Sequence, residues 1–143
     1  MAPLSNEDRI RCSKAACEAQ ALAYQPYSGF AVGAAFLRRE GTLVKGCNIE
    51  NASYSLTMCA ERVALHTAVA AGWDDLVLLA VASPGGVAPC GACRQVLAEH
   101  VPNLEVLLVD TSTMQEEPWR HWEVTSVAAL LPQAFGPEDL GQG

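Results

Sequence analysis

Residues 76–100 read LVLLAVASPGGVAPCGACRQVLAEH, and they carry the clearest structural pattern in the chain. The first eight are almost all apolar, which is typical of a strand buried on both faces of a sheet. A loop rich in Gly and Pro follows over 84–89, and the residues after Pro89 predict a helix over 90–100. A further apolar run predicts a strand over 104–109.

The flanking sequence adds elements of both kinds. Ser5 and Asp8 approximate a capping box at the start of the first helix, and Gly72 ends the helix that precedes the strand at 76–83. The other predicted elements are helices over 5–24, 59–71 and 125–131 and strands over 30–37, 42–49 and 118–124. This order predicts an α/β fold, in which a mixed sheet is covered by helices on both faces.

Length and composition predict one domain over 1–143, with a loose tail over 136–143. The net charge of −7 argues against nucleic acid as a partner, because phosphate backbones attract basic surfaces. The longest apolar run, at 76–82, is too short to cross a membrane, and Glu7 and Asp8 stand where a secretory signal would be apolar. We expect a cytoplasmic protein, with the nucleus left open. Only 17% of residues are charged, which favours coverage of part of the surface by another subunit.

Three of the six cysteines predict a metal site. Cys59, Cys90 and Cys93 stand at the starts of two predicted helices, where unpaired backbone N–H groups favour the thiolate that zinc prefers. Three protein ligands leave the fourth tetrahedral position open, as in catalytic zinc sites. Glu61, two residues after Cys59, is then a candidate to move protons beside the metal.

Other interpretations of the cysteines stay open at this point. Cys47 could supply a fourth ligand and close a structural site, while Cys12 and Cys17 fit buried apolar positions. The Cys-x-x-Cys spacing also occurs in redox proteins, but a redox pair leaves Cys59 without a role.

The segments Cys59-Ala60-Glu61 and Pro89-Cys90-Gly91-Ala92-Cys93 match the signature of zinc nucleobase deaminases. From about residue 10 to 140, the chain resembles the small, homotetrameric, zinc-dependent cytidine deaminases of pyrimidine salvage. The further matching segments are Pro26-Tyr27-Ser28, Gly46-Cys47-Asn48-Ile49-Glu50-Asn51-Ala52, Arg62, Arg94-Gln95, Leu130-Leu131-Pro132 and Phe135-Gly136-Pro137. The Asn48–Asn51 segment is the one that points to cytidine.

The resemblance implies a three-layer α/β/α fold with a five-stranded mixed sheet. It implies one Zn²⁺ per subunit on Cys59, Cys90 and Cys93, with Glu61 as the catalytic proton carrier. The reaction would be hydrolysis of cytidine and deoxycytidine to uridine and deoxyuridine, with release of ammonia. The implied substrate-binding residues, some of them from neighbouring subunits, are Phe30, Asn48, Glu50, Ala52, Tyr54, Ala60 and Phe135.

The chemistry of these residues agrees with the resemblance. A neutral amide at Asn48 and a carboxylate at Glu50 suit sugar hydroxyls, and the carboxylate would repel a phosphate, which favours a nucleoside over a nucleotide. Zinc with three thiolates carries a net charge of −1, which weakens it as a Lewis acid. Arg62 is the side chain best placed to hydrogen-bond a ligand thiolate and offset that charge.

Two functional alternatives remain. Another small zinc deaminase, such as a blasticidin-type enzyme, would share the cysteines and Glu61, and a structural zinc protein would share the cysteines alone. The sequence also departs from the family at 110–123, which holds no Gly where relatives often have a glycine-containing turn.

Overall fold

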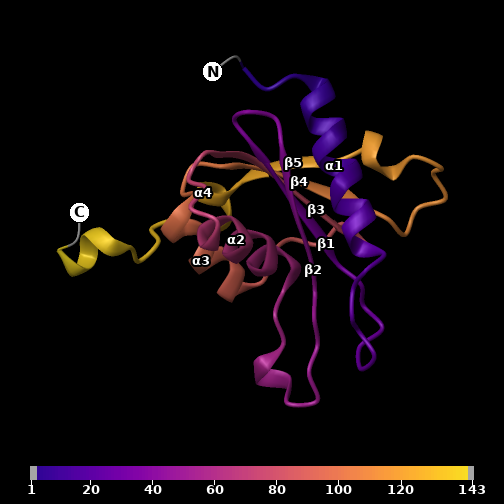
Figure 1. Cartoon of the computed structure of the whole chain (residues 1–143), viewed down its shortest axis with the longest axis horizontal. Coiled ribbons are helices and arrows are strands. Elements are labelled where there is room, and N and C mark those ends of the chain that lie inside the picture. The colour runs from indigo at the N-terminus through magenta and orange to yellow at the C-terminus, as the bar shows by residue number, and fades with distance from the viewer. Residues whose placement is uncertain (1–2, 142–143) are drawn as a thin grey trace.

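A five-stranded mixed sheet in the order β2-β1-β3-β4-β5 forms the middle layer of the fold (Figure 1). The structure is a computed structural model and describes residues 3–141. The strands are β1 Gly33–Arg38, β2 Leu43–Cys47, β3 Leu76–Ser83, β4 Glu105–Asp110 and β5 Glu123–Ser126. β3 and β4 are parallel and the other neighbours are antiparallel, so the sheet is mixed, as predicted.

Helices cover both faces of this sheet, which confirms the three-layer prediction (Figure 1). The helices are α1 Asn6–Gln20, α2 Ala60–Ala70, α3 Gly91–His100 and α4 Val127–Leu130. Successive residues of a strand face opposite sides, so Leu78 packs with the α1 layer and Leu79 with the α2 layer. Within residues 3–141, no helix has both the length and the apolar character needed to cross a membrane.

The first helix begins as predicted and ends earlier. Ser5 Oγ accepts a hydrogen bond from the Asp8 N–H at 3.0 Å, and the Asp8 carboxylate accepts one from the Ser5 N–H at 2.9 Å. α1 ends at Gln20, not at residue 24. The chain leaves the helix there because the Tyr24 backbone pairs with Asn48 and Glu50, at 3.0 and 2.9 Å. This pairing brings the N-terminal turn to the strand end that carries candidate site residues.

The start of α2 is fixed by a close approach to β2. A Cβ on Gly46 would lie 2.5 Å from the Ala64 nitrogen and 2.7 Å from the Ala60 carbonyl oxygen. Only glycine lets the helix lie this close to the strand, because real Cβ atoms keep a longer distance. The backbone that presents Cys59 is therefore set by Gly46.

The C-terminal part differs from the prediction. The strand expected over 118–124 begins only at Glu123, and Pro118–Arg120 forms a 3-10 helix. Proline fixes φ and lacks an N–H, which suits the first turn of a helix and not a paired strand. The helix expected over 125–131 is the single turn of α4, because Thr125 and Ser126 belong to β5. A further 3-10 helix that was not predicted, Pro137–Leu140, lies in the tail.

Candidate active site

Three thiols converge where two helices begin. Cys59 is the N-cap of α2, Cys90 is the N-cap of α3, and Cys93 lies in the first turn of α3. The Sγ atoms of Cys59 and Cys90 are 3.7 Å apart, and those of Cys90 and Cys93 are 3.6 Å apart. All three Sγ atoms lie within 4.8 Å of one another. The residues predicted to bind metal are thus brought to one point.

This triangle of sulfurs fits zinc. A tetrahedral ion with Zn–S bonds of about 2.3 Å places its sulfur ligands about 3.8 Å apart. Among residues 3–141, the cluster holds three metal-ligating side chains and no fourth. Cys47 lies elsewhere, with its Sγ 3.5 Å from the Leu22 carbonyl oxygen. The arrangement therefore leaves one tetrahedral position open and does not support a closed structural site.

The surroundings of Cys59 favour negative charge, whereas a hydrogen bond with Cys59 and burial raise the pKa of Cys93. The side chains of Cys59 and Cys90 do not cap their own helices, so both Sγ atoms are free to face the cluster. The pKa of Cys59 is lowered to about 5, first by a hydrogen bond from Cys93 and then by Arg62. Arg62 donates from Nη2 to Cys59 Sγ at 3.3 Å; the sequence predicted a hydrogen bond from Arg62 to one of the three thiols without specifying which.

Arg62 also has an unused donor beside the sulfurs. Its Nε is buried and has no hydrogen-bond partner in the described part of the chain. A buried N–H without an acceptor is costly. A cluster of thiolates around a metal ion offers more acceptor charge than neutral thiols do, so this donor also fits a metal centre.

Glu61 lies in the first turn of α2 and is 4% exposed. Its pKa is raised to about 7, mainly because burial disfavours the charged carboxylate and next because Cys59 is negative. A carboxyl group with a pKa near neutrality can both accept and donate a proton at physiological pH. Its position beside the thiols suits the proton transfer predicted for it.

A cavity of about 280 Å³ opens onto the cysteine cluster. Apolar side chains form most of its wall, together with a few polar groups, as is common for small-molecule sites. Its lining includes four of the predicted substrate-binding residues, Phe30, Asn48, Glu50 and Ala60, together with Cys59, Glu61 and Cys90. Val81 from β3 and Val87 and Ala88 from the following loop also line it, and these three were not predicted.

Asn48 orders the wall of this cavity. It is 8% exposed, and its amide donates to the Phe30 carbonyl at 2.8 Å and accepts from the Val32 N–H at 2.9 Å. These bonds hold the segment that leads into β1. Asn48 thus positions Phe30, besides offering its remaining amide hydrogen-bonding capacity to a ligand.

Glu50 anchors the turn formed by Pro26–Gly29. Its carboxylate accepts hydrogen bonds from the Tyr27 N–H at 3.0 Å, from the Ser28 N–H at 3.1 Å and from the Ser28 hydroxyl. These bonds, that of the Ser28 hydroxyl first, lower the pKa of Glu50, so a carboxylate faces the cavity. Ser28 received no role from sequence reasoning, although its place in the Pro26–Gly29 turn was a usable signal.

Three predicted substrate-binding residues do not line the cavity of their own chain. Tyr54 is 73% exposed and borders a neighbouring hollow with Tyr27, while Ala52 is exposed in the same loop. Phe135 is 58% exposed and lines a separate hollow near the C-terminus. Their roles stay predictions that depend on a second subunit.

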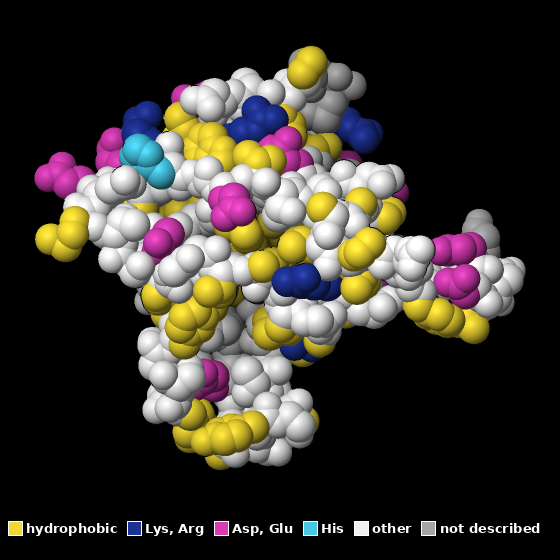
Figure 2. Space-filling model, turned by 180° about the vertical axis from the view of Figure 1, so that it is seen from behind, with side chains coloured by type: hydrophobic (Ala, Val, Ile, Leu, Met, Phe, Trp, Pro, Cys, Tyr) yellow, Lys and Arg dark blue, Asp and Glu magenta, His cyan; other side chains and the backbone are white. Residues whose placement is uncertain are grey.

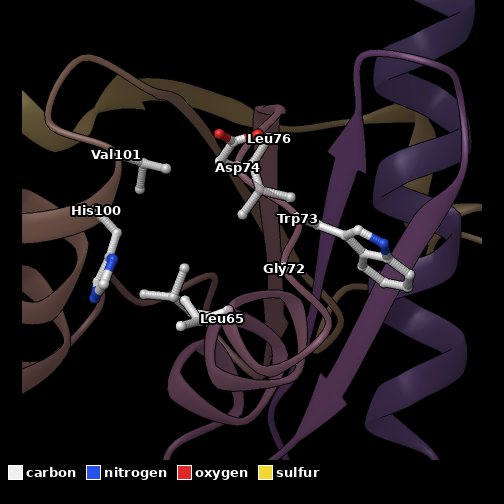
Figure 3. Close-up of a pocket in the computed structure, with 8 residues that line it drawn as sticks. Leu65, Gly72, Trp73, Asp74, Leu76, His100 and Val101 are labelled. Atoms are coloured by element: carbon white, nitrogen blue, oxygen red, sulfur yellow. The ribbon is translucent and has the colours of Figure 1, made fainter.

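Another hollow, of about 250 Å³, lies beside the C-terminal half of α2 (Figure 3). Leu65, Leu76 and Val101 converge on it, and His100 stands at its edge (Figure 3). None of the three clustered cysteines lines it, so it is not the candidate active site.

Comparisons with known proteins agree with this site. Residues 6–107 match the family described as the cytidine and deoxycytidylate deaminase zinc-binding region. The cytidine deaminase of Halalkalibacterium halodurans is 45% identical over 135 residues, which cover 93% of this chain and 98% of that protein. The cytidine deaminase of Sporosarcina psychrophila is 48% identical over 126 residues, which cover 86% of this chain and 88% of that protein.

Solved structures extend the comparison. The crystal structure of cytidine deaminase from Burkholderia pseudomallei has a TM-score of 0.78 and 47% identity, covering 87% of this chain and 97% of that one. The crystal structure of the Mycobacterium tuberculosis cytidine deaminase has a TM-score of 0.71 and 40% identity, covering 88% and 95%.

Proposed function

The chain belongs to the cytidine deaminase family, and we propose that it hydrolyses cytidine and deoxycytidine to uridine and deoxyuridine. The observation that carries the proposal is the cluster of Cys59, Cys90 and Cys93, open at one position, with buried Glu61 beside it in the wall of a cavity. Cys59, Cys90 and Cys93 are the residues that would hold zinc. When bound, zinc supplies a Lewis acid that lowers the pKa of a water molecule so that it can act as a nucleophile.

Glu61 moves the protons of the reaction. It takes a proton from the water and delivers it to N3 of the cytosine ring, which makes C4 more electrophilic. The water oxygen bonds to C4, and Glu61 then takes the remaining proton from that oxygen and relays it to the amino group. The C4–N bond breaks, ammonia leaves with the bonding electron pair, and the oxygen remains as the C4 carbonyl of the uracil ring.

The cavity wall supports a nucleoside substrate. We assign Phe30 to the face of the pyrimidine ring and the backbone N–H of Ala60 to an acceptor on the base. Ala60 is the first residue of α2, where the helix itself gives the N–H no partner. Asn48 and Glu50 are assigned to the ribose hydroxyls. The carboxylate of Glu50 disfavours a phosphate at this end of the cavity.

We further propose a homotetramer, in which neighbours complete each pocket. Hydrophobic side chains gather on the two parts that project from the body, the loop over 49–58 and the C-terminal segment (Figure 2). Ile49, Leu56 and Tyr54 are 46%, 67% and 73% exposed in a single chain. Such patches mark protein contacts, and Tyr54 and Phe135 lie on these projections, where a neighbour could receive them.

The proposal also covers the pathway, the location in the cell and the kind of partner. Conversion of cytidine to uridine is a reaction of pyrimidine salvage. We place this reaction in the cytoplasm. The net charge of −7 supports a small-molecule substrate and not nucleic acid or a membrane surface as partner.

Chromatographic assay of four substrates tests the function. Cytidine and deoxycytidine should be converted with release of ammonia. Free cytosine, which lacks the ribose, and cytidine monophosphate, which carries a phosphate, should react far more slowly. Turnover of none of the four by zinc-loaded protein would overturn the proposal. Preferred turnover of cytidine monophosphate would overturn the assignment of Glu50.

A further inference from the structure

Arg94 joins two separate parts of the chain that both bear on the active site. It lies on α3, one residue after Cys93. Its Nε donates to the Pro89 carbonyl oxygen at 2.7 Å, and its Nη1 donates to the Leu130 carbonyl oxygen at 2.9 Å. One guanidinium group thus holds two backbone carbonyls that lie 41 residues apart in sequence.

The first of these contacts fixes the backbone just before α3, at the Pro89 carbonyl, and does not cap the helix. An N-cap side chain ordinarily bonds the first turn of its helix, but that of Cys90 faces the sulfur cluster. Arg94 instead reaches back over the first turn to the residue before Cys90. The peptide plane between Pro89 and Cys90 is therefore set by Arg94, and with it the direction of the Cys90 side chain.

The second contact ties down the C-terminal segment. Leu130 is the last residue of α4, and a cationic side chain at its carbonyl stabilises a helix end. The next residue of α3, Gln95, donates from Nε2 to the Phe135 carbonyl at 2.8 Å. Neighbouring side chains of one helix thus hold both ends of the segment 130–135.

We propose that Arg94 is a positioning residue for the metal ligand Cys90, and that the same side chain links the metal centre to the C-terminal segment 130–135. The inference rests on the proposed function in one respect, that Cys59, Cys90 and Cys93 bind zinc. Because a coupling between two sites is reciprocal, zinc stabilises the docked segment, and the docked segment strengthens zinc binding.

The linkage is tested first on the unaltered protein. Hydrogen exchange of peptides that cover 130–135 is measured by mass spectrometry with zinc bound and after removal of zinc by a chelator. We expect exchange in this segment to quicken when zinc is removed, and to change more than exchange in α1 on the opposite face of the sheet. Exchange that does not respond to zinc would overturn the linkage.

Two substitutions then test the role of the side chain, with zinc affinity measured by competition with a chromogenic chelator. Arg94→Ala should weaken zinc binding about 10-fold, the low end of the effect of residues that orient metal ligands. Its segment 130–135 should exchange rapidly whether or not zinc is present. Arg94→Lys keeps the charge but cannot place two N–H groups on two carbonyls, so it should also bind zinc more weakly than the unaltered protein.

The matched control is Arg9→Ala. Arg9 also bridges two partners, Glu105 at 2.7 Å and the Leu4 carbonyl at 3.1 Å, but it lies in the α1 layer. This variant should lose thermal stability and keep its zinc affinity. Zinc affinity within about 2-fold of the unaltered protein for Arg94→Ala, or full affinity for Arg94→Lys, would overturn the inference. Zinc-loaded protein that fails to deaminate cytidine would overturn the proposed function and leave this comparison intact.

Discussion

Arg62 donates a hydrogen bond to the Sγ of Cys59 across 3.3 Å, and both residues stand in the first turn of α2. The contact puts a fixed positive charge beside a metal centre that would otherwise carry a net charge of −1. It also uses a helix start whose backbone already favours a thiolate. In the proposed zinc site, the charge of the three sulfur ligands is thus offset by groups from the same helix that supplies one of them.

Removal of the Arg62 charge should weaken the metal centre. Arg62→Gln is expected to lower zinc affinity by about 10–100-fold and to reduce kcat of the zinc-loaded protein, because more charge stays on the sulfurs. Chelator competition and steady-state kinetics measure the two effects. Arg120→Gln is the control, since Arg120 pairs with Glu117 on an exposed 3-10 helix. Equal zinc affinity in the two variants would refute the role given to Arg62.

Gly46→Ala should destabilise the fold. The new methyl group would lie 2.5 Å from the Ala64 nitrogen, so α2 must move away from β2 at a cost of about 1–3 kcal/mol. Denaturant unfolding of the zinc-loaded protein measures the loss. Gly91→Ala is the matched change, because its Cβ would meet nothing within 4 Å. A Gly46→Ala variant as stable as Gly91→Ala would show that the close approach is not needed.

Substitution of Glu50 should change the preference between nucleoside and nucleotide. Glu50→Gln keeps an oxygen for the Tyr27 and Ser28 N–H groups but removes the negative charge that faces the cavity. We expect kcat/KM for cytidine to fall and the ratio of cytidine monophosphate to cytidine turnover to rise by about 10-fold, or 1.4 kcal/mol of discrimination. An unchanged ratio would mean that the carboxylate does not exclude the phosphate.

Zinc should protect the clustered thiols from alkylation. Cys90 is exposed, so iodoacetamide should modify it rapidly in metal-free protein and slowly in zinc-loaded protein. Cys12 should stay unmodified in both, because it is fully buried and its pKa is raised to about 12 by burial. Peptide mass spectrometry gives the modified positions. Equal labelling of Cys90 with and without zinc would argue against the metal site.

Formation of the homotetramer should depend on the apolar side chains of the loop over 49–58 and of the C-terminal segment. Light scattering is expected to give four times the mass of the chain, and Leu56→Glu should yield smaller species with reduced activity. Leu56 is 67% exposed in the loop that carries Tyr54. Met114→Glu, at a fully exposed position of another loop, is the control and should stay tetrameric. A monomeric mass with full activity would contradict the homotetramer.

Local patterns predicted the centre of this fold well. The sequence predicted both ends of the strand over 76–83 correctly. A continuous apolar run of this length between two loops is typical of a buried strand. β5 was misplaced because its four residues, Glu123–Ser126, show no buried alternation and pair only through β4. The early end of α1 likewise depends on a distant partner, since Tyr24 pairs with Asn48 and Glu50, just beyond the end of β2.

The active site also contains some features that local sequence patterns predict and others that depend on distant parts of the chain. The cysteine cluster and Glu61 could be predicted because short motifs at helix starts carry their geometry. The contacts of Arg94 with Pro89 and Leu130 could not, since the second partner lies 36 residues further along the chain and only the folded structure brings it near. The role proposed for Phe135 depends on a homotetramer, which no pattern within one chain specifies.

The most direct test of the account is the rate of cytidine deamination by zinc-loaded Glu61→Gln, compared with the unaltered protein at equal zinc content. Glu61 serves several proton transfers, so its loss should cost more than the usual 10²–10⁴-fold for one acid–base step, in a protein that still folds and binds zinc. The account therefore predicts a nearly inactive enzyme. A variant that keeps more than about a tenth of the original rate would contradict Glu61 as the proton carrier of this site.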